Sequence, residues 1–257
     1  MVVDAHAKIN LTLEVLGRRP DGYHDLRSVV LPIHLSDEID LAPADETQIT
    51  VYSSLAGDCP HQTGNRLPQL ETFENLAVKA LRLLQRIAGR TDDFHISITK
   101  RIPLGAGLGG GSADAAAVLN ALNDDWHLGI SRTELAALSV EIGSDVPALV
   151  LGGPVLMEGR GERVTPLAAS PCANFPLPDL SRLILRTPPI FVSTPSVFRE
   201  FRPSDRGRGK NDLQPAACRL HPEIAAALEA LHAEGCEDVM MSGSGSSVFG
   251  WRHLASV

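Results

Sequence analysis

Five of the seven residues 105–111 are glycine. The segment follows an alternating apolar pattern at Phe94, Ile96 and Ile98 that predicts a strand, and it precedes an alanine-rich stretch, 113–122, that predicts a helix. Glycine lets several backbone N–H groups turn toward one anion, and a helix N-terminus adds partial positive charge at the same place. The sequence therefore predicts an anion-binding loop between a strand and a helix, rather than a plain flexible linker.

The glycine spacing by itself fits more than one kind of phosphate loop. Gly105, Gly107 and Gly110 match the dinucleotide-binding pattern, but that pattern needs an acidic residue at the end of a second strand about 20 residues on. Asp124 and Asp125 lie at that distance, yet they directly follow the predicted helix. The segment also lacks the Gly-Lys-Ser/Thr of a Walker A loop and the Gly-x-Ser-x-Gly of a hydrolase elbow. The spacing alone leaves a dinucleotide site and an ATP site open.

Composition narrows the class of protein. The chain carries 23 Lys and Arg against 31 Asp and Glu, a formal net charge of −8, which argues against a general nucleic-acid binder. An anionic substrate would therefore need a local positive site. We expect no membrane span and no signal peptide, because there is no stretch of about 20 apolar residues and no basic segment before an apolar run at the N-terminus. The four scattered cysteines fit a cytoplasmic protein better than a disulfide framework.

Polar and apolar residues alternate near the start of the chain. The pattern predicts a half-buried strand over residues 7–15, and it places Lys8 and Asn10 on the same face of that strand. The sequence Pro-Asp-Gly at 20–22 predicts a turn. Further expected segments are a pair of strands over 26–35 and 38–41 and a long loop over 52–74.

The remainder of the chain predicts a mixture of helices and strands. Asn75 is expected to be the N-cap of a helix that Gly89 ends, and Pro147 suits the first turn of a short helix opened by residues 143–147. From about residue 169 prolines punctuate short expected strands, which suggests two domains, residues 1–168 and 169–257. Further helices are expected over 132–141 and 222–233, and a strand with a turn over 239–251. The predicted fold class is α+β.

Several motifs carry a resemblance to a known family. The loop PLGAGLGGGSADAA, which begins at Pro103, resembles the phosphate loop of the galactokinase, homoserine, mevalonate and phosphomevalonate (GHMP) kinases. Within that superfamily the chain is similar to the 4-diphosphocytidyl-2-C-methyl-D-erythritol kinases, through motifs that follow the family's order along nearly the whole chain. These motifs are AKIN from Ala7, RRPDGYHDL from Arg18, IGSDVP from Ile142, EGRGERVTPL from Glu158, STPSVF from Ser193, NDL from Asn211 and MSGSGSSVFG from Met241. The resemblance favours an ATP site.

The resemblance implies a two-domain GHMP kinase fold, with a ribosomal-protein-S5-like N-terminal domain, a ferredoxin-like C-terminal domain, and ATP and substrate in the cleft between them. It implies transfer of the γ-phosphoryl group of ATP, with Mg²⁺, to the 2-hydroxyl of 4-diphosphocytidyl-2-C-methyl-D-erythritol, a step of the non-mevalonate isoprenoid route, in a monomer or homodimer. Family members usually continue with a further helix and strand after the last motif, so we expect a shortened C-terminal domain. The alternatives are a catalytically impaired nucleotide-binding homologue and a GHMP kinase for another small alcohol.

Lys8 and Asp145 match the catalytic lysine and aspartate of the family. Asp145 would accept the proton of the substrate hydroxyl, and Lys8 would stabilise charge on that hydroxyl and on the transferred phosphoryl group. Asn10 would orient the hydroxyl. In the isolated sequence, a helix N-cap explains Asp145 equally well, and a solvated strand lysine explains Lys8 equally well.

Aromatic residues supply the expected base site. Tyr23 and His24 match the residues with which the family contacts cytidine, and Phe198 lies at the position of a second aromatic residue. Two rings could sandwich a cytosine, a contact worth roughly 1–3 kcal/mol per stacked base. The alternatives are a surface tyrosine that covers the turn and a core phenylalanine. These rings separate the hypotheses, because homoserine and mevalonate have no base.

The other expected contacts surround the phosphates. Thr194, Gly243 and Ser244 are expected on the substrate side, although the late glycine motif also fits a tight turn. Ser112 and Asp145 are candidate Mg²⁺ ligands, and the basic loop 206–210 is expected to be solvated. The expected nucleotide contacts are Pro103, Leu104, Gly105, Ala106, Gly107, Leu108, Gly109, Gly110, Gly111, Ser112, Ala113 and Asn75.

Overall fold

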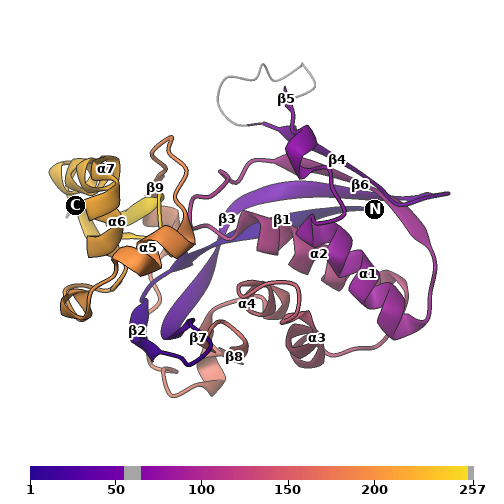
Figure 1. Cartoon of the computed structure of the whole chain (residues 1–257), viewed down its shortest axis with the longest axis horizontal. Helices are drawn as coiled ribbons and strands as arrows, with labels where there is room; N and C mark the ends of the chain where they lie inside the picture. Colours follow the sequence, from indigo (N-terminus) through magenta and orange to yellow (C-terminus); the bar gives the residue numbers. More distant parts are fainter. Residues whose placement is uncertain (55–64, 254–257) are drawn as a thin grey trace.

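One long strand, β3 (His24–Ala44), runs through the larger of two sheets in the computed structural model, which describes residues 1–54 and 65–253 (Figure 1). It pairs antiparallel with four other strands. These are β1 (Val2–Asn10), β2 (Glu14–Arg18), β6 (Asp93–Lys100) and β7 (Val155–Gly159). The sheet is completed by β4 (Gln48–Ser53), β5 (Asn65–Arg66) and β8 (Arg163–Pro166).

The expected strand pair over 26–35 and 38–41 is wrong, because β3 continues through both segments. Ser36 and Asp37 lie between the two expected strands, and Asp37 is fully buried and accepts hydrogen bonds from the backbone N–H groups of Arg101 and Ile102. The carboxylate of Asp37 satisfies two backbone N–H groups that follow β6, so a charged residue is accommodated within a continuous strand. The expected loop over 52–74 contains the end of β4, β5 and a short 3₁₀ helix at Pro68–Leu70, and its residues 55–64 lie outside the described residues.

The first predicted strand is broken. β1 ends at Asn10 and β2 begins at Glu14, although the alternating apolar residues of 7–15 are all buried. Leu13 leaves the sheet at this point: its N–H donates to the carbonyl of Lys210 and its carbonyl accepts from the N–H of Asp212. The segment between β1 and β2 therefore ties the first part of the chain to the second.

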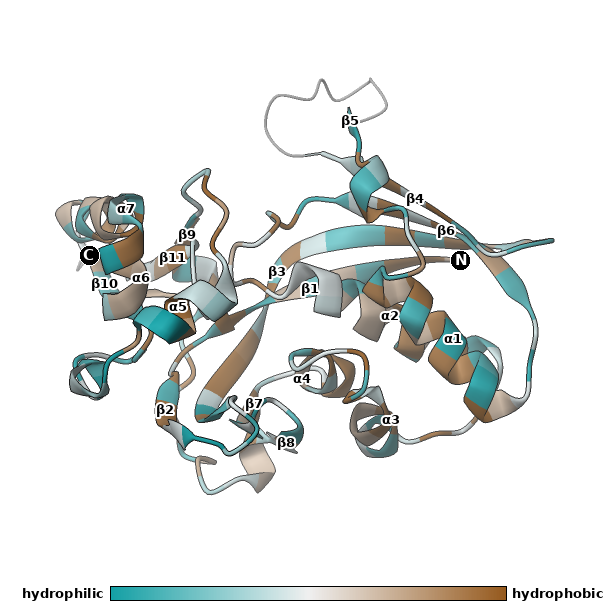
Figure 2. Ribbon diagram, viewed as in Figure 1, coloured by the Kyte–Doolittle hydropathy of each residue, from teal (hydrophilic) through white to brown (hydrophobic). Residues whose placement is uncertain are grey.

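Helices α1 (Leu76–Ala88) and α2 (Gly110–Asp125) pack against the large sheet, and α3 (Arg132–Ser139) and α4 (Val146–Leu151) lie beside them (Figure 1). The α1 boundaries are confirmed. The side chain of Asn75 accepts from the N–H of Ala77, and Gly89 ends the helix in the left-handed conformation. Hydrophilic and hydrophobic bands alternate along α1, as expected of a helix with one buried face (Figure 2). Helix α2 begins three residues earlier than the alanine-rich stretch indicated, so it includes the last glycines of the loop.

The second part of the chain forms a three-stranded sheet in the order β10-β11-β9 with three helices. The strand and turn expected over 239–251 are confirmed as two strands joined by a turn, and the helix expected over 222–233 is confirmed. The proline-rich residues 169–205 hold one strand, one α-helix and 3₁₀ turns instead of several short strands. The elements are β9 (Leu183–Arg186), α5 (Thr194–Glu200), α6 (Gln214–Leu220), α7 (Pro222–Ala233), β10 (Cys236–Met241) and β11 (Val248–Arg252).

The two larger hydrophobic cores each contain residues from both parts of the chain. Phe249 and Trp251 of β11 belong to the large core with α1 and α2, whereas Leu13 and Val15 belong to the core of the second part.

Within the described residues, no helix has the length and apolar character needed to cross a membrane. Three cysteines are free thiols, and Cys59 lies outside the described residues.

Candidate active site

A cavity of about 1190 Å³ is lined by residues from both parts of the chain. Lys8, Asn10 and Asp145 line it, together with the glycine loop except Leu108 and Ala113. The expected substrate contacts that also line it are Tyr23, His24, Thr194, Phe198, Gly243 and Ser244. The tertiary structure thus brings almost every predicted site residue to one cavity.

The glycine loop presents backbone donors to this cavity. Gly110, Gly111 and Ser112 form the first turn of α2, and the first N–H groups of a helix have no intrahelical acceptor. They also lie where the helix dipole favours negative charge. The N–H of Ala113 already donates to the carbonyl of Gly109 at 2.8 Å, so it is not a free donor for an anion. The three free donors match the needs of a phosphate group.

Three predicted nucleotide contacts lie outside the cavity lining. The side chains of Leu108 and Ala113 are buried in the large core, and the carbonyl of Leu108 accepts from the N–H of Lys8 at 3.0 Å. The carboxamide of Asn75 caps α1 and donates to the carbonyl of Leu70 at 2.9 Å. These contacts give the three residues structural roles, and only the backbone of Leu108 adjoins Lys8.

The geometry around Lys8 supports a reactive pair. Its Nζ lies 3.4 Å from Oδ2 of Asp145, and it donates to Oδ1 of Asn10 at 2.7 Å and to the carbonyl of Gly107 at 3.0 Å. The side chain of Lys8 is only 4 % exposed, so the solvated-lysine alternative is wrong. Asp145 precedes α4, but its side chain makes no capping hydrogen bond and is 32 % exposed. Its carboxylate therefore remains open to the cavity.

Two serines that sequence reasoning missed hold this pair in place. The amide of Asn10 donates to Oγ of Ser28 at 2.7 Å, and Ser28 is fully buried on β3. Ser242 donates to the carbonyl of Gly107 at 2.9 Å and accepts from the N–H of Asn10 at 3.3 Å. The late glycine motif could have pointed to Ser242, whereas no local signal marks Ser28.

The glycine loop and the late glycine turn are in direct contact. Gly107 has a φ of +74°, and a Cβ built on it would lie 2.2 Å from the carbonyl oxygen of Ser242. Gly243 faces back toward Gly107 and toward Nζ of Lys8. Only glycine allows this approach, so two distant motifs form one wall of the cavity.

The aromatic residues lie together at another part of the cavity lining. The rings of His24 and Phe198 are stacked, with centroids 4.9 Å apart, so no base fits between these two. Tyr23 is 57 % exposed, and the guanidinium of Arg160 lies 4.9 Å from its ring centre. The pKa of His24 is lowered by burial and by the positive charges of Arg18 and Arg206. A base could stack on Tyr23, or on the face of Phe198 that His24 leaves free.

The remaining substrate-side residues connect α5 with the late glycine turn. Oγ1 of Thr194 and Oγ of Ser244 lie 2.7 Å apart, within hydrogen-bonding distance. Asn211, buried on the segment before α6, donates to the carbonyls of Met241 and Gly243 at 2.8 and 2.9 Å. These bonds fix the late glycine turn to α5 and to the segment before α6.

Two family models match the chain. The model of the GHMP kinases N terminal domain matches residues 75–153, and that of the GHMP kinases C terminal matches residues 196–254. The first range contains the glycine loop and Asp145, and the second contains Phe198 and the late glycine turn.

Curated relatives cover almost the whole chain. A 4-diphosphocytidyl-2-C-methyl-D-erythritol kinase of Symbiobacterium thermophilum is 40% identical over 97% of this chain and 90% of its own length. The protein of the same name from Brevibacillus brevis is 37% identical over 96% of this chain and 86% of its own.

Solved structures agree with these relatives. A crystal structure of 4-(cytidine 5'-diphospho)-2C-methyl-D-erythritol kinase superposes with a TM-score of 0.75 at 34% identity, over 98% of this chain and 90% of the other. A homoserine kinase from Cytophaga hutchinsonii shares the fold, with a TM-score of 0.65 at 20% identity over 97% of this chain and 84% of the other. Identity over nearly the full length, both domain models and the shared fold lead to one conclusion: the chain belongs to the 4-diphosphocytidyl-2-C-methyl-D-erythritol kinases, small-molecule kinases of the GHMP superfamily.

Proposed function

We propose that this kinase transfers the γ-phosphoryl group of ATP to the 2-hydroxyl of 4-diphosphocytidyl-2-C-methyl-D-erythritol, in the non-mevalonate isoprenoid route. The observation that carries the proposal is the 3.4 Å approach of Lys8 to Asp145 in a cavity that also receives the free N–H groups of α2. Relatives that carry this substrate in their names are up to 40% identical over nearly the full length, which supports the choice of substrate.

The site residues divide the chemistry between them. Asp145 accepts the proton of the acceptor hydroxyl as its oxygen attacks the γ-phosphorus, and ADP leaves. Lys8 stabilises the negative charge on the attacking oxygen and on the transferred group. Asn10 is fixed by Lys8 on one side and by Ser28 on the other, so it holds the hydroxyl without rotating. The first turn of α2 holds the phosphates.

Magnesium is part of the proposal. The described residues contain no group of three His, Cys, Asp or Glu side chains able to form a protein metal centre. Kinases need no such centre, because Mg²⁺ is held largely by substrate phosphates and one or two protein oxygens. Ser112 and Asp145 both line the cavity and supply oxygens of this kind. A bound Mg²⁺ would neutralise phosphate charge during transfer.

The organisation of the chain is proposed on the same basis. We assign residues 1–168 to an ATP-binding domain and 169–257 to a substrate-binding domain, with the shared cores holding them together. We place the enzyme in the cytoplasm, as its free thiols suggest, and we propose a monomer or homodimer.

An assay with purified protein tests the reaction. Release of ADP is coupled to NADH oxidation, and the phosphorylated product is identified by phosphorus NMR. We expect turnover with the cytidyl diphosphate substrate and little with homoserine or mevalonate. If the folded protein turned over no faster than an Asp145→Asn variant, or preferred an alcohol without a nucleotide, the proposal would be wrong.

A further inference from the structure

Positive charge is concentrated in the lining of the cavity. Four arginines line it, Arg18, Arg160, Arg199 and Arg206, and Asp145 is the one carboxylate among the described residues that does so. The chain as a whole has a formal net charge of −8, so this lining is a local reversal of sign. A cleft lined by one sign of charge attracts ligands of the opposite sign.

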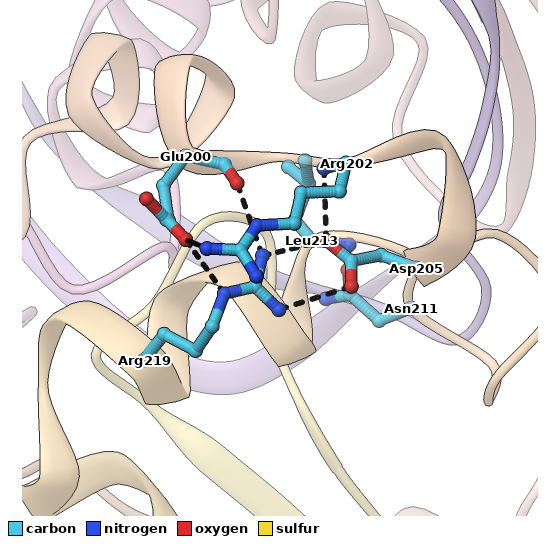
Figure 3. A network of polar contacts seen from close by, with 6 residues as sticks. All are labelled: Glu200, Arg202, Asp205, Asn211, Leu213 and Arg219. Carbon is cyan, nitrogen blue, oxygen red and sulfur yellow. Dashed lines mark hydrogen bonds and ion pairs between the residues drawn. The ribbon is translucent and has the colours of Figure 1, made fainter.

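The same four arginines have no ion-pair partner in the part of the chain that the structure describes, although neighbouring arginines do. Arg19 lies 2.9 Å from a carboxylate oxygen of Asp25, and it does not line the cavity. Arg202 and Arg219 are neutralised in one network by Glu200 and the buried Asp205 (Figure 3). Arg19, Arg202 and Arg219 are thus paired beside the cavity, whereas the four arginines that line it have no ion pair within the described residues.

The network in Figure 3 also fixes the segment that carries Arg206. Two nitrogens of the Arg219 guanidinium donate to the two oxygens of Asp205 at 2.7 and 3.0 Å, and the N–H of Arg202 donates to Asp205 at 2.9 Å. Arg206 follows directly, with its guanidinium 5.9 Å from the ring centre of Phe201. Arg206 is exposed, as expected of loop 206–210, and it also lines the cavity.

Three of these arginines surround the aromatic residues. Arg160 lies over Tyr23, Arg206 over Phe201, and Arg18 and Arg206 both contribute to the lowered pKa of His24. Arg199 differs, since it donates to Oγ of Ser196 at 2.9 Å. Aromatic rings can stack on a base, and unpaired guanidinium groups can bind the phosphates attached to that base.

We propose that Arg18, Arg160 and Arg206 form a second anion site, separate from the glycine loop, that binds the diphosphate of the nucleotide-linked substrate. The identity of that substrate rests on the proposed function, whereas the anion site rests on the unpaired arginines. The site makes the diphosphate a determinant of specificity, because an acceptor alcohol without it gives the three cavity-lining guanidinium groups no anionic ligand. The glycine loop remains free for ATP.

Binding of cytidine 5'-diphosphate and of cytidine tests the site without turnover. We expect the wild-type protein to bind the diphosphate more tightly than the nucleoside, and the preference to fall as salt is raised. Arg18→Gln, Arg160→Gln and Arg206→Gln should each weaken diphosphate binding by about tenfold and leave cytidine binding unchanged, because a charge-assisted bond is lost and the rings remain. Arg208→Gln is the matched control, since Arg208 is exposed on the same loop, forms no ion pair within the described residues and does not line the cavity.

Kinetics separate this inference from the proposed function. In the three variants KM for the acceptor should rise about tenfold while KM for ATP stays unchanged. Turnover of the expected substrate with no selective effect of the three substitutions would overturn the anion site and leave the proposed function standing. Arginine-dependent diphosphate binding without turnover would support the anion site and count against the proposed function. Equal losses for cytidine and its diphosphate, or equal losses in Arg208→Gln, would also overturn the site.

Discussion

The ammonium of Lys8 on β1 lies 3.4 Å from the carboxylate of Asp145 at the start of α4, and the same ammonium donates to Asn10 at 2.7 Å. Lys8 is buried and Asp145 is half-exposed, so the lysine is fixed from behind while the aspartate faces the cavity. The contact between Lys8 and Asp145 joins β1 to the start of α4, beside Gly109 of the glycine loop. The predictions for Asp145, Ser28 and the two loop glycines concern groups that hold or adjoin this contact, and the prediction for Asp114 concerns a buried carboxylate of α2.

Asp145→Asn should lower kcat by at least about 100-fold, because the amide cannot accept the hydroxyl proton. KM for ATP should change little, since the phosphates are held by the backbone of α2. The melting temperature should stay close to that of the wild type, because the side chain makes no capping bond. An amide variant with near-normal kcat would show that Asp145 is not the base.

Ser28→Ala should lower kcat by about tenfold without raising KM for ATP. The substitution removes the acceptor that holds the amide of Asn10 at 2.7 Å, and a neutral hydrogen bond of this kind is worth about 1 kcal/mol. Ser36→Ala on the same strand is the control. The side chain of Ser36 donates a hydrogen bond to Asp4 at an exposed position. Steady-state kinetics of both variants decide the matter: equal kcat values would exclude a positioning role for Ser28.

Gly107→Ala and Gly109→Ala should fail in different ways. Alanine at either position has a positive φ, which costs about 1–2 kcal/mol. At Gly107 the new Cβ also meets the carbonyl of Ser242 at 2.2 Å, so the melting temperature should fall most. At Gly109 it meets the Lys8 side chain at 3.1 Å, so kcat should fall more than stability does.

Gly129→Ala is the control for these two variants, because it has a similar φ of +67° with open space around it. Thermal unfolding and kinetics are measured on all three proteins. If Gly107→Ala were no less stable than Gly129→Ala, the contact with Ser242 would not join the two motifs as described.

Asp114 should make stability depend on pH. Burial raises its pKa to about 7, even though the Lys100 ammonium lies 2.7 Å away. An unfolded aspartate has a pKa of about 3.9. Because the folded value is the higher one, this group's contribution is complete below about pH 4 and is lost as pH rises toward 7.

Asp114→Asn should remove that dependence, since the amide keeps an oxygen for Lys100 and cannot ionise. We expect the difference in unfolding free energy between variant and wild type to shift in favour of the variant from pH 5 to pH 8, measured by urea denaturation. Asp179→Asn, at an exposed 3₁₀ turn, is the control for an aspartate with a lowered pKa. A pH-independent difference for Asp114→Asn would contradict the assignment.

The sequence by itself determined the features that depend on neighbours a few positions away. The boundaries of α1 followed from Asn75 and Gly89, because a cap and a left-handed end are local choices of the backbone. The glycine loop before α2 followed from composition and periodicity, and the order of the motifs indicated the family that the comparisons then showed.

Only the tertiary structure decided which polar groups are partnered. Asp37 lies between two expected strands that form one strand in the structure, and the N–H groups of Arg101 and Ile102 donate to its buried carboxylate. Lys8 and Asp145 were ambiguous until burial and distance separated a reactive pair from a solvated lysine and a helix cap. Arg18 and Arg19 are adjacent and chemically identical, yet one lines the cavity and the other is paired. Burial, charge pairing and the close approach of Gly107 to Ser242 depend on segments that meet only when the chain has folded, so no local pattern in the sequence can encode them.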